Sequence, residues 1–335
     1  MKALILTEDL NIRLVEMEEP ELKAGYVIID VKACGICGTD MHVYKGMASN
    51  WSLPGIIGHE FAGVVCACAG DVKDYKPGDR VTAQPLLNCG KCATCREGRT
   101  NLCTGIRLIG GEYPGAFAEK VAVPADKLIK VPDRIPLEKA ALSEPLATVI
   151  HGLGRLKKQR YESVLILGAG ALGLLALQML RDRAENIAIS DVSEVRLKVA
   201  KALGATCTIN AARQEVEKEV LEMTKGGRID LAIDAAGFSS TRQQAFQLIK
   251  PGGELLFIAL GQKETPVDFM QLVTSELSMY GTQCHTMEDF HLAIEAMDKI
   301  DYDKIVTQFP LEQGEEAFKK LREDPGYGIK LHLVP

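Results

Sequence analysis

Four cysteines stand close together in the stretch CGKCATCREGRTNLC, with the spacing C-x2-C-x2-C-x7-C. Four thiolates at this spacing can converge on one tetrahedral zinc ion, and two-residue gaps suit zinc geometry better than disulfide geometry. A chance cluster is a weaker explanation than a shared metal. Because an all-cysteine shell has no open coordination position, we expect this zinc to shape a loop rather than to catalyse. The cysteines are Cys89, Cys92, Cys95 and Cys103.

Length and composition limit the class of protein. A chain of 335 residues exceeds what one hydrophobic core usually supports, so two domains are expected. The net charge of −6 offers no basic surface for nucleic acid or an anionic membrane. No apolar run approaches the ~18 residues of a spanning helix, and the N-terminal stretch lacks a signal-type apolar core. Metal-binding thiolates fit a reducing compartment, so we expect a cytoplasmic protein.

The hydrophobic pattern changes along the chain. Short alternating segments at 26–33, 61–69 and 117–123 predict an antiparallel β domain. From about residue 145, the apolar strands VLIL, NIAIS, ATCTIN, IDLAID and ELLFIAL alternate with helix-length segments, which predicts a parallel, doubly wound α/β sheet. We predict that residues 1–145, with a zinc lobe at 86–104, and residues 285–335 form one domain. The α/β domain at 146–284 would be inserted into it.

A buried strand at residues 163–167 runs directly into the sequence GAGALG and then into an apolar helix. In this context, the glycines of G-x-G-x-x-G permit a tight turn, backbone approach to a pyrophosphate, and close packing of helix on strand. Asp191 ends the next strand about 20 residues later, where a carboxylate binds the adenosine ribose and repels a 2′-phosphate. We therefore predict an NAD site, the alternative being a structural glycine turn with a solvated aspartate. The predicted cofactor-binding residues are Gly168, Gly170, Leu172, Gly173, Asp191, Arg196 and Leu260.

A second group of metal-ligand residues lies nearer the N-terminus, in the stretches CGICGTDMH (34–42) and GHE (58–60). A thiolate and an imidazole from separate loops are ligands typical of a catalytic zinc site. Such a site also needs a third protein ligand and a free position for substrate. Cys37 and His59 are the candidate ligands.

The whole chain resembles the zinc-dependent medium-chain alcohol and polyol dehydrogenases. The motifs GHEFAGVVCACAGDV, PGDRV, GAFAEKVAVP, SEPLA and GAGALGLLA, together with the cysteine lobe, follow in that family's order. The resemblance implies a GroES-like β-rich catalytic domain with an inserted Rossmann domain. It also implies two zinc ions per chain, NAD as cofactor, and assembly into a homo-oligomer, with a tetramer favoured over a dimer.

The resemblance assigns ligands to the catalytic zinc. Cys37 and His59 match two of the family's ligands. Glu144 in SEPLA stands where the alcohol dehydrogenases have a cysteine, a form similar to the sorbitol, threonine and sugar-acid dehydrogenases. In relatives, the carboxylate matching Glu60 binds the metal directly, binds it through water, or alternates with water. The alternative for both glutamates is a carboxylate that hydrogen-bonds behind the ligands.

The resemblance also assigns catalytic roles to Thr39, His42 and Glu60. An alcohol at the catalytic zinc ionises near neutral pH and passes a hydride to nicotinamide. Thr39 matches the hydroxyl that relays the proton, and His42 matches the residue that carries it to solvent. For His42 the alternative is a surface histidine without a role. Asp40 is expected to orient His59 through the second ring nitrogen.

The resemblance also indicates which segments contact the substrate. The loop from residue 44 to 53 and the segment 281–285 match regions that line the substrate cleft in relatives. Sorbitol dehydrogenases have an arginine and an aromatic residue where this chain has Cys284 and His285. We therefore expect a secondary hydroxyl of a polyol, sugar acid or sugar phosphate to be oxidised to a ketone, with L-threonine as an alternative. A non-catalytic NAD-binding sensor is the alternative from another class. The predicted substrate residues are Tyr44, Trp51, Gln283, Cys284 and His285.

Overall fold

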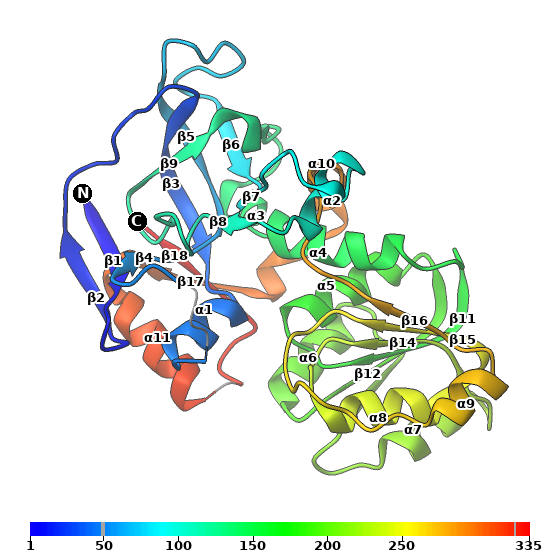
Figure 1. Cartoon of the computed structure of the whole chain (residues 1–335). Coiled ribbons are helices and arrows are strands. Elements are labelled where there is room, and N and C mark those ends of the chain that lie inside the picture. Colours follow the sequence, from blue (N-terminus) through cyan, green and yellow to red (C-terminus); the bar gives the residue numbers. More distant parts are fainter. Residues whose placement is uncertain (48–50, 325) are drawn as a thin grey trace. The chain divides into compact units, whose positions relative to one another are not determined.

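The computed structural model covers residues 1–335 and describes all of them except 48–50 and 325 (Figure 1). The chain divides into two compact units. The first unit consists of Met1–Ala147, Thr286–Asp298 and Val306–Pro335. The second consists of Thr148–His285 and Lys299–Ile305. The short segment 299–305, which the sequence placed with the tail of the first domain, therefore belongs to the second unit.

The first unit is built mainly on antiparallel β-structure, as predicted, but its last two strands, β17 and β18, pair in parallel. Its larger sheet has the strand order β10-β6-β5-β3-β18-β17, with β9 paired to β3. A smaller sheet has the order β2-β1-β4. The larger sheet contains β3 (Tyr26–Gly35), β5 (Glu60–Cys68), β6 (Arg80–Ala83), β9 (Lys120–Pro124), β10 (Leu128–Lys130), β17 (Val306–Pro310) and β18 (Lys330–Val334). The smaller sheet contains β1 (Lys2–Leu6), β2 (Ile12–Glu16) and β4 (Gly55–Ile56).

Two strand pairings bring distant parts of the first unit together. β3 and β5 pair antiparallel with Gly35 opposite Glu60, so the residues just after β3 and just before β5 meet at the same end of the sheet. The last strand of the chain, β18, pairs antiparallel with the same end of β3 through His332 opposite Gly35. This end of the sheet therefore collects three chain segments, 35–40, 58–60 and 330–332.

The apolar core of the first unit fills the space between its sheets and the helix α11 (Gly314–Glu323). Phe318 on this helix is fully buried, and its ring makes edge-to-face contacts with Tyr44 and Phe117 at centroid distances of 5.5 and 5.7 Å. Each edge-to-face pair of this kind contributes about 0.5–1.5 kcal/mol beyond the burial of the two rings. The helix α1 (Gly38–Tyr44), which ends at Tyr44, is thereby anchored to the core.

The second unit is a parallel sheet with strand order β13-β12-β11-β14-β15-β16. Its central strands are buried on both faces, which accounts for the apolar run VLIL in the first of them. The strand IDLAID is buried along its whole length even though two of its residues are aspartates. The strands are β11 (Tyr161–Leu167), β12 (Ala184–Asp191), β13 (Cys207–Asn210), β14 (Ile229–Asp234), β15 (Ile249–Phe257) and β16 (Ser278–Gly281). The helices include α5 (Ala171–Leu180), α6 (Glu194–Ala202), α7 (Val216–Met223), α8 (Ser239–Leu248) and α9 (Phe269–Thr274).

The strand order of this sheet reverses at β11. The chain first adds β12 and β13 on one side of β11 and then returns to add β14, β15 and β16 on the other. Ligands of open parallel sheets bind at the carboxyl ends of the strands at such a reversal. The predicted fold class, a β-rich domain carrying an inserted doubly wound parallel sheet, is confirmed. Among the helices that the structure describes, none is both long and apolar enough to cross a membrane.

Candidate metal centres and cofactor site

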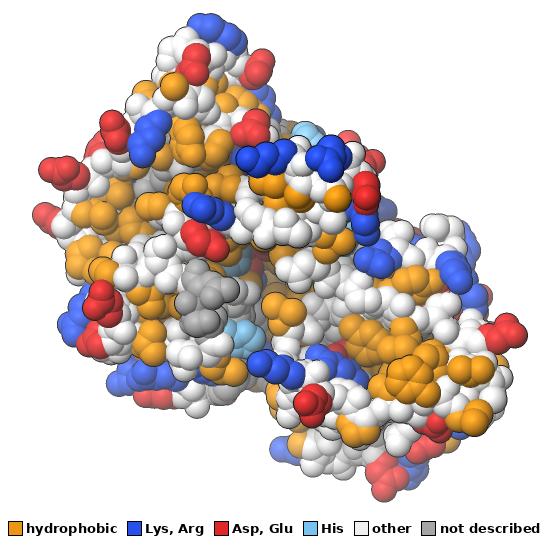
Figure 2. Space-filling model, in the orientation of Figure 1, with side chains coloured by type: hydrophobic (Ala, Val, Ile, Leu, Met, Phe, Trp, Pro, Cys, Tyr) orange, Lys and Arg blue, Asp and Glu red, His pale blue; other side chains and the backbone are white. Residues whose placement is uncertain are grey.

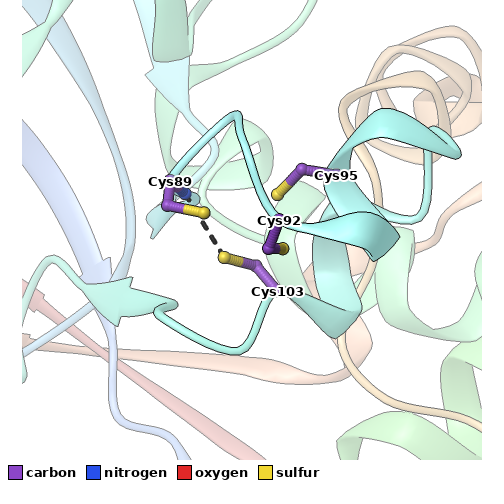
Figure 3. A group of neighbouring side chains, drawn as sticks. All are labelled: Cys89, Cys92, Cys95 and Cys103. Carbon is purple, nitrogen blue, oxygen red and sulfur yellow. Dashed lines mark hydrogen bonds between the residues drawn. The ribbon is translucent and has the colours of Figure 1, made fainter.

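The four-cysteine lobe is closed at its base by a short hairpin. β7 (Leu86–Leu87) pairs antiparallel with β8 (Arg107–Leu108), and the chain between them contains α2 (Ala93–Arg96). Figure 3 shows the four cysteine sulfur atoms turned toward a common centre. Their sulfur atoms all lie within 4.8 Å of one another. A tetrahedral site with zinc–sulfur bonds of about 2.3 Å needs sulfur atoms roughly 3.8 Å apart, and the lobe is compatible with that arrangement.

Hydrogen bonds around the lobe favour the thiolate form that zinc requires. The Cys89 amide donates to Cys103 Sγ at 3.3 Å, and Cys92 Sγ lies 3.2 Å from the hydroxyl of Thr94. That hydroxyl, with nearby backbone amides, lowers the pKa of Cys92 to about 5. Burial and the neighbouring thiols raise the pKa of Cys95 to about 11. A bound divalent cation would offset the burial and the thiol hydrogen bonds that favour the protonated form of Cys95.

The second candidate centre consists of Cys37, His59 and Glu60, whose ligand atoms also lie within 4.8 Å of one another. Cys37 is the N-cap of α1, and its Sγ accepts a hydrogen bond from the Thr39 amide at 3.4 Å. The Asp40 carboxylate closes a capping box by accepting from the Cys37 amide at 2.8 Å. The start of α1 therefore orients the thiolate, which the positive end of the helix dipole stabilises.

Buried charges surround His59. Its Nδ1 lies 3.5 Å from Asp40 Oδ1, and both side chains are almost completely buried. Burial lowers the pKa of His59, but the negative charges of Asp40 and Cys37 outweigh this and hold it well above its usual range. The Asp40 carboxylate therefore lies beside one ring nitrogen of His59, and its role in orienting that ring stays a prediction.

Glu60 forms a buried ion pair that the sequence did not predict. Lys330 Nζ lies 2.8 and 2.6 Å from the two carboxylate oxygens of Glu60, and it also donates to the Ile36 carbonyl at 3.1 Å. Burial lowers the pKa of Lys330, but Glu60 and Cys37 outweigh it and raise the pKa above the ordinary value. The only sequence signal for this ion pair is the position of Lys330 inside the apolar strand GIKLHLV. It indicates that the lysine has a buried partner of opposite charge but not which residue that partner is.

Glu144 lies near the same charges but outside the tight group of three ligand atoms. It stands in the first turn of α4 (Ser143–Gly154) and is 9% exposed. Burial raises its pKa to about 7, His59 opposes this rise, and Glu60 adds to it. Because the charges of His59 and Glu60 both affect the pKa of Glu144, its carboxyl group lies close to the centre. In this arrangement, Glu60 rather than Glu144 completes the group with Cys37 and His59.

The two predicted relay residues lie on the helix that Cys37 caps. Thr39 and His42 are three residues apart on α1, so their side chains share one face of the helix. Both are half-buried. The Thr39 backbone amide donates a hydrogen bond to Cys37 Sγ, so the start of this helix lies beside the cluster, and the relay role of the two side chains stays a prediction.

The glycine turn of the second unit has the geometry of a dinucleotide site. Gly168 has φ of 104°, which favours glycine, and a Cβ atom on Gly173 would lie 1.9 Å from the Gly168 carbonyl oxygen. Gly170 caps α5, and nothing lies within 4 Å of where its Cβ would be. The Asp191 carboxylate accepts from the Ala169 amide at 2.8 Å. Open backbone at a helix N-terminus, beside a carboxylate, suits a pyrophosphate and a ribose.

The remaining predicted cofactor residues lie in the same unit. Leu172 and Arg196 are half-buried on α5 and α6. Leu260 follows β15 and is 65% exposed, which is unusual for a leucine that follows a buried strand. Sequence reasoning missed the ion pair between Asp234 and Arg242 near the same edge of the sheet.

The predicted substrate residues divide between the two units. In the first unit, Tyr44 is 7% exposed and packs on Phe318, so we assign it a structural role. Trp51 packs against the core of that unit, whereas residues 48–50 of the same predicted loop lie outside the described residues. In the second unit, Gln283 is exposed and Cys284 is half-buried. His285 is fully buried with its Nδ1 3.3 Å from the Thr148 hydroxyl, which also indicates a structural role.

Comparisons with known proteins agree with this architecture. The family model described as the alcohol dehydrogenase GroES-like domain matches residues 23–133, and the zinc-binding dehydrogenase model matches residues 171–299. Sorbitol dehydrogenase of Bacillus subtilis is 32% identical, over 100% of this chain and 97% of its own. L-threonine 3-dehydrogenase of Pyrococcus horikoshii is 33% identical, over 92% of this chain and 91% of its own.

A solved structure extends the comparison to three dimensions. A zinc-binding dehydrogenase of Sinorhizobium meliloti, described as putative and crystallised with NADP, superposes with a TM-score of 0.93. It is 28% identical and covers 100% of this chain and 99% of its own. The chain belongs to the zinc-dependent medium-chain alcohol and polyol dehydrogenase family, as the motifs predicted. It is therefore an oxidoreductase of the alcohol and polyol dehydrogenase class.

Replacing one cysteine of each cluster should separate the roles of the two centres. We expect Cys37→Ser to stay folded, to hold about one zinc per chain and to lose turnover, whereas Cys95→Ser should unfold at a lower temperature. The reason is that binding energy at a structural zinc is also folding energy. Cys66→Ser, which alters a β5 cysteine outside both clusters, is the matched control and should keep two zinc ions. Metal analysis and thermal unfolding measure both effects, and a single zinc in fully active protein would contradict the assignment.

Proposed function

We propose that this protein oxidises a secondary hydroxyl group of a polyol, sugar acid or sugar-alcohol derivative to a ketone, with NAD as the hydride acceptor and two zinc ions per chain. The observation that carries the proposal is the convergence of Cys37, His59 and Glu60 within 4.8 Å in the first unit. A protein that only sensed a dinucleotide would need the glycine turn of the second unit but no such cluster. Turnover is therefore the better explanation.

In this proposal, each side chain around the cluster has one task. Cys37 and His59 hold the catalytic zinc, with Glu60 or Glu144 as the carboxylate ligand. Bound zinc supplies a Lewis acid that brings the pKa of a hydroxyl toward neutrality. Asp40 orients His59. Lys330 neutralises Glu60, which keeps the summed negative charge of the site low enough for a carboxylate and a thiolate to stay buried.

The reaction must remove one proton and one hydride from the substrate. Bound NAD would supply the acceptor for the hydride, which carries both electrons of the C–H bond. The hydroxyl proton passes to the Thr39 hydroxyl, which gives up its own proton toward His42 and then solvent. Both residues lie on one face of α1 beside Cys37, which supports this order.

The substrate class rests on the relatives and on the carboxylate at position 144. Sorbitol dehydrogenase of Bacillus subtilis aligns over the whole chain, which supports a polyol. The similar identity to an L-threonine 3-dehydrogenase supports a second candidate, the secondary hydroxyl of L-threonine. Sugar-alcohol phosphates remain within the same class of substrate.

A substrate panel tests the proposal directly. Zinc-loaded protein is incubated with NAD and each of a set of sugar alcohols, aldonates, sugar-alcohol phosphates, vicinal diols and L-threonine, and NADH is followed at 340 nm. We expect NADH with a subset of secondary alcohols and none from Cys37→Ser. Tight binding of NADH without turnover of any compound would favour the sensor instead.

Cofactor choice should depend on Asp191. Its carboxylate stands beside the glycine turn, where it would repel the 2′-phosphate of NADP. We expect at least a ~10-fold preference for NAD in kcat/KM, the effect of about 1.4 kcal/mol. This preference for NAD over NADP should become smaller in Asp191→Asn, which keeps the size of the side chain but removes its charge. It should also become smaller in Asp191→Ser. Both cofactors must be assayed, because one relative was crystallised with NADP. If the native protein has a higher kcat/KM with NADP than with NAD, Asp191 does not have the proposed role of repelling the 2′-phosphate.

The proton relay can be tested at Thr39. Because the valine side chain has the same shape without the hydroxyl, Thr39→Val should lower kcat by about 10²- to 10⁴-fold and leave NADH affinity nearly unchanged. His42→Gln should be milder, since water can replace a terminal carrier, and added imidazole should partly restore its rate. A loss of only ~2-fold in Thr39→Val would mean that Glu60 or water accepts the proton.

We also propose a homo-oligomer, more readily a tetramer than a dimer. β16 lies at the edge of the parallel sheet and pairs only with β15 among the described strands, so its outer edge can pair with a second copy. Exposed apolar side chains of the nearby segments, Phe269, Met270, Val273 and Met279, support an interface. Figure 2 shows hydrophobic side chains gathered on this part of the second unit. Light scattering at micromolar concentration should give a multiple of 36.4 kDa, and a monomer would contradict the proposal.

A further inference from the structure

The strand β14 ends on a fully buried carboxylate that none of the roles above uses. Asp234 is 0% exposed. Its Oδ1 accepts hydrogen bonds from the amides of Ala236 and Gly237 at 3.2 and 3.0 Å, and from the hydroxyl of Thr241 at 2.9 Å. Its Oδ2 pairs with Arg242 Nε at 3.1 Å. The carboxylate thus organises the turn that follows β14 and the first turn of α8.

Arg242 extends this network to the loop that follows β15. Its Nη1 donates to the Gln262 carbonyl at 2.6 Å and to the Thr265 hydroxyl at 3.3 Å. The backbone amide of Gln262 donates to the Gly237 carbonyl at 2.9 Å. The side-chain oxygen Oε1 of Gln262 accepts from the Ser239 amide at 2.5 Å. The loops 235–239 and 259–265 are therefore tied together by one guanidinium group and one side-chain amide.

The same loops touch the glycine turn. A Cβ on Gly261 would lie 2.1 Å from the Gly237 carbonyl oxygen, so the two loops meet backbone to backbone. A Cβ on Gly168 would lie 3.0 Å from Ala235 C and from Ala236 N. The loops that follow the adjacent strands β11, β14 and β15 are thus in contact at the carboxyl edge of the sheet. The exposed Leu260 projects from the outermost of them.

We infer that Asp234 and Arg242 are positioning residues for the dinucleotide: they hold the loops 235–239 and 259–265 in the arrangement that presents Leu260 and supports the glycine turn. The inference rests on the proposed function, because it assumes that NAD occupies this edge. Asp234 is buried and acts only through the loops. A buried ion pair contributes little net stability compared with apolar residues, so its value lies in selecting one loop arrangement.

The chain provides a matched control on the same strand. Asp230, near the opposite end of β14, is 5% exposed and pairs with Lys250 at 2.5 Å. This pair lies at the amino edge of the sheet, away from the glycine turn, which follows the carboxyl end of β11. Removing the pair of Asp230 with Lys250 should destabilise the same unit without changing the arrangement of the loops 235–239 and 259–265.

The test compares Arg242→Met, Arg242→Lys and Lys250→Met in the zinc-loaded full chain, with NADH as the probe. Fluorescence titration measures the Kd for NADH, and thermal unfolding measures stability. If the binding arrangement falls to about one-tenth of the molecules, Arg242→Met raises the Kd and the KM for NAD about tenfold, with kcat at saturating NAD nearly unchanged. Arg242→Lys should recover part of the affinity. Lys250→Met should lower the midpoint of unfolding without changing the Kd.

Each outcome bears on the inference. Native affinity in Arg242→Met overturns it, as does an equal loss in Lys250→Met, because affinity would then follow general stability. If Arg242→Met does not fold, Thr241→Val removes a single donor to Asp234 and should still raise the Kd by about twofold to threefold, and no change there overturns the inference. Failure of the native protein to bind NADH would instead reject the proposed cofactor site itself.

Discussion

The antiparallel pairing of β3 with β5 is the constraint on which the first centre depends. With Gly35 opposite Glu60, the chain must place Cys37 just beyond one strand and His59 just before the other, at one end of the sheet. β18 adds Lys330 to the same place, although it lies 270 residues from Glu60 in the chain. A one-residue slip in this register would turn every side chain to the opposite face and disperse the cluster.

Burial then forces the charges at this end to compensate one another. Asp40 faces His59, and Lys330 pairs with Glu60. Uncompensated charges in such surroundings would cost several kcal/mol each, so each group must be paired or bound to a cation. The same reasoning applies to the four-cysteine lobe, where burial and hydrogen bonds with the neighbouring thiols raise the pKa of Cys95 and a bound cation would favour its thiolate form.

In the second unit, the parallel sheet sets where the chemistry can occur. The turns after β11, β14 and β15 meet at one edge because parallel strands present their carboxyl ends together. Glycines let these turns touch, and the pair of Asp234 with Arg242 ties two of them. Binding residues and the residues that position them therefore follow from the same topology.

The sequence alone determined whatever is encoded by local spacing. The intervals between Cys89, Cys92, Cys95 and Cys103, the glycine turn before α5 and the period of the hydrophobic pattern predicted the zinc lobe, the dinucleotide turn and both domain types. Local spacing can carry these predictions because each depends on residues that are neighbours in the chain. Tertiary structure alone decided that Lys330 meets Glu60, that Tyr44 and His285 are buried, and that Arg242 bridges two loops. Such contacts depend on strand register and on packing between distant segments, which no local spacing specifies.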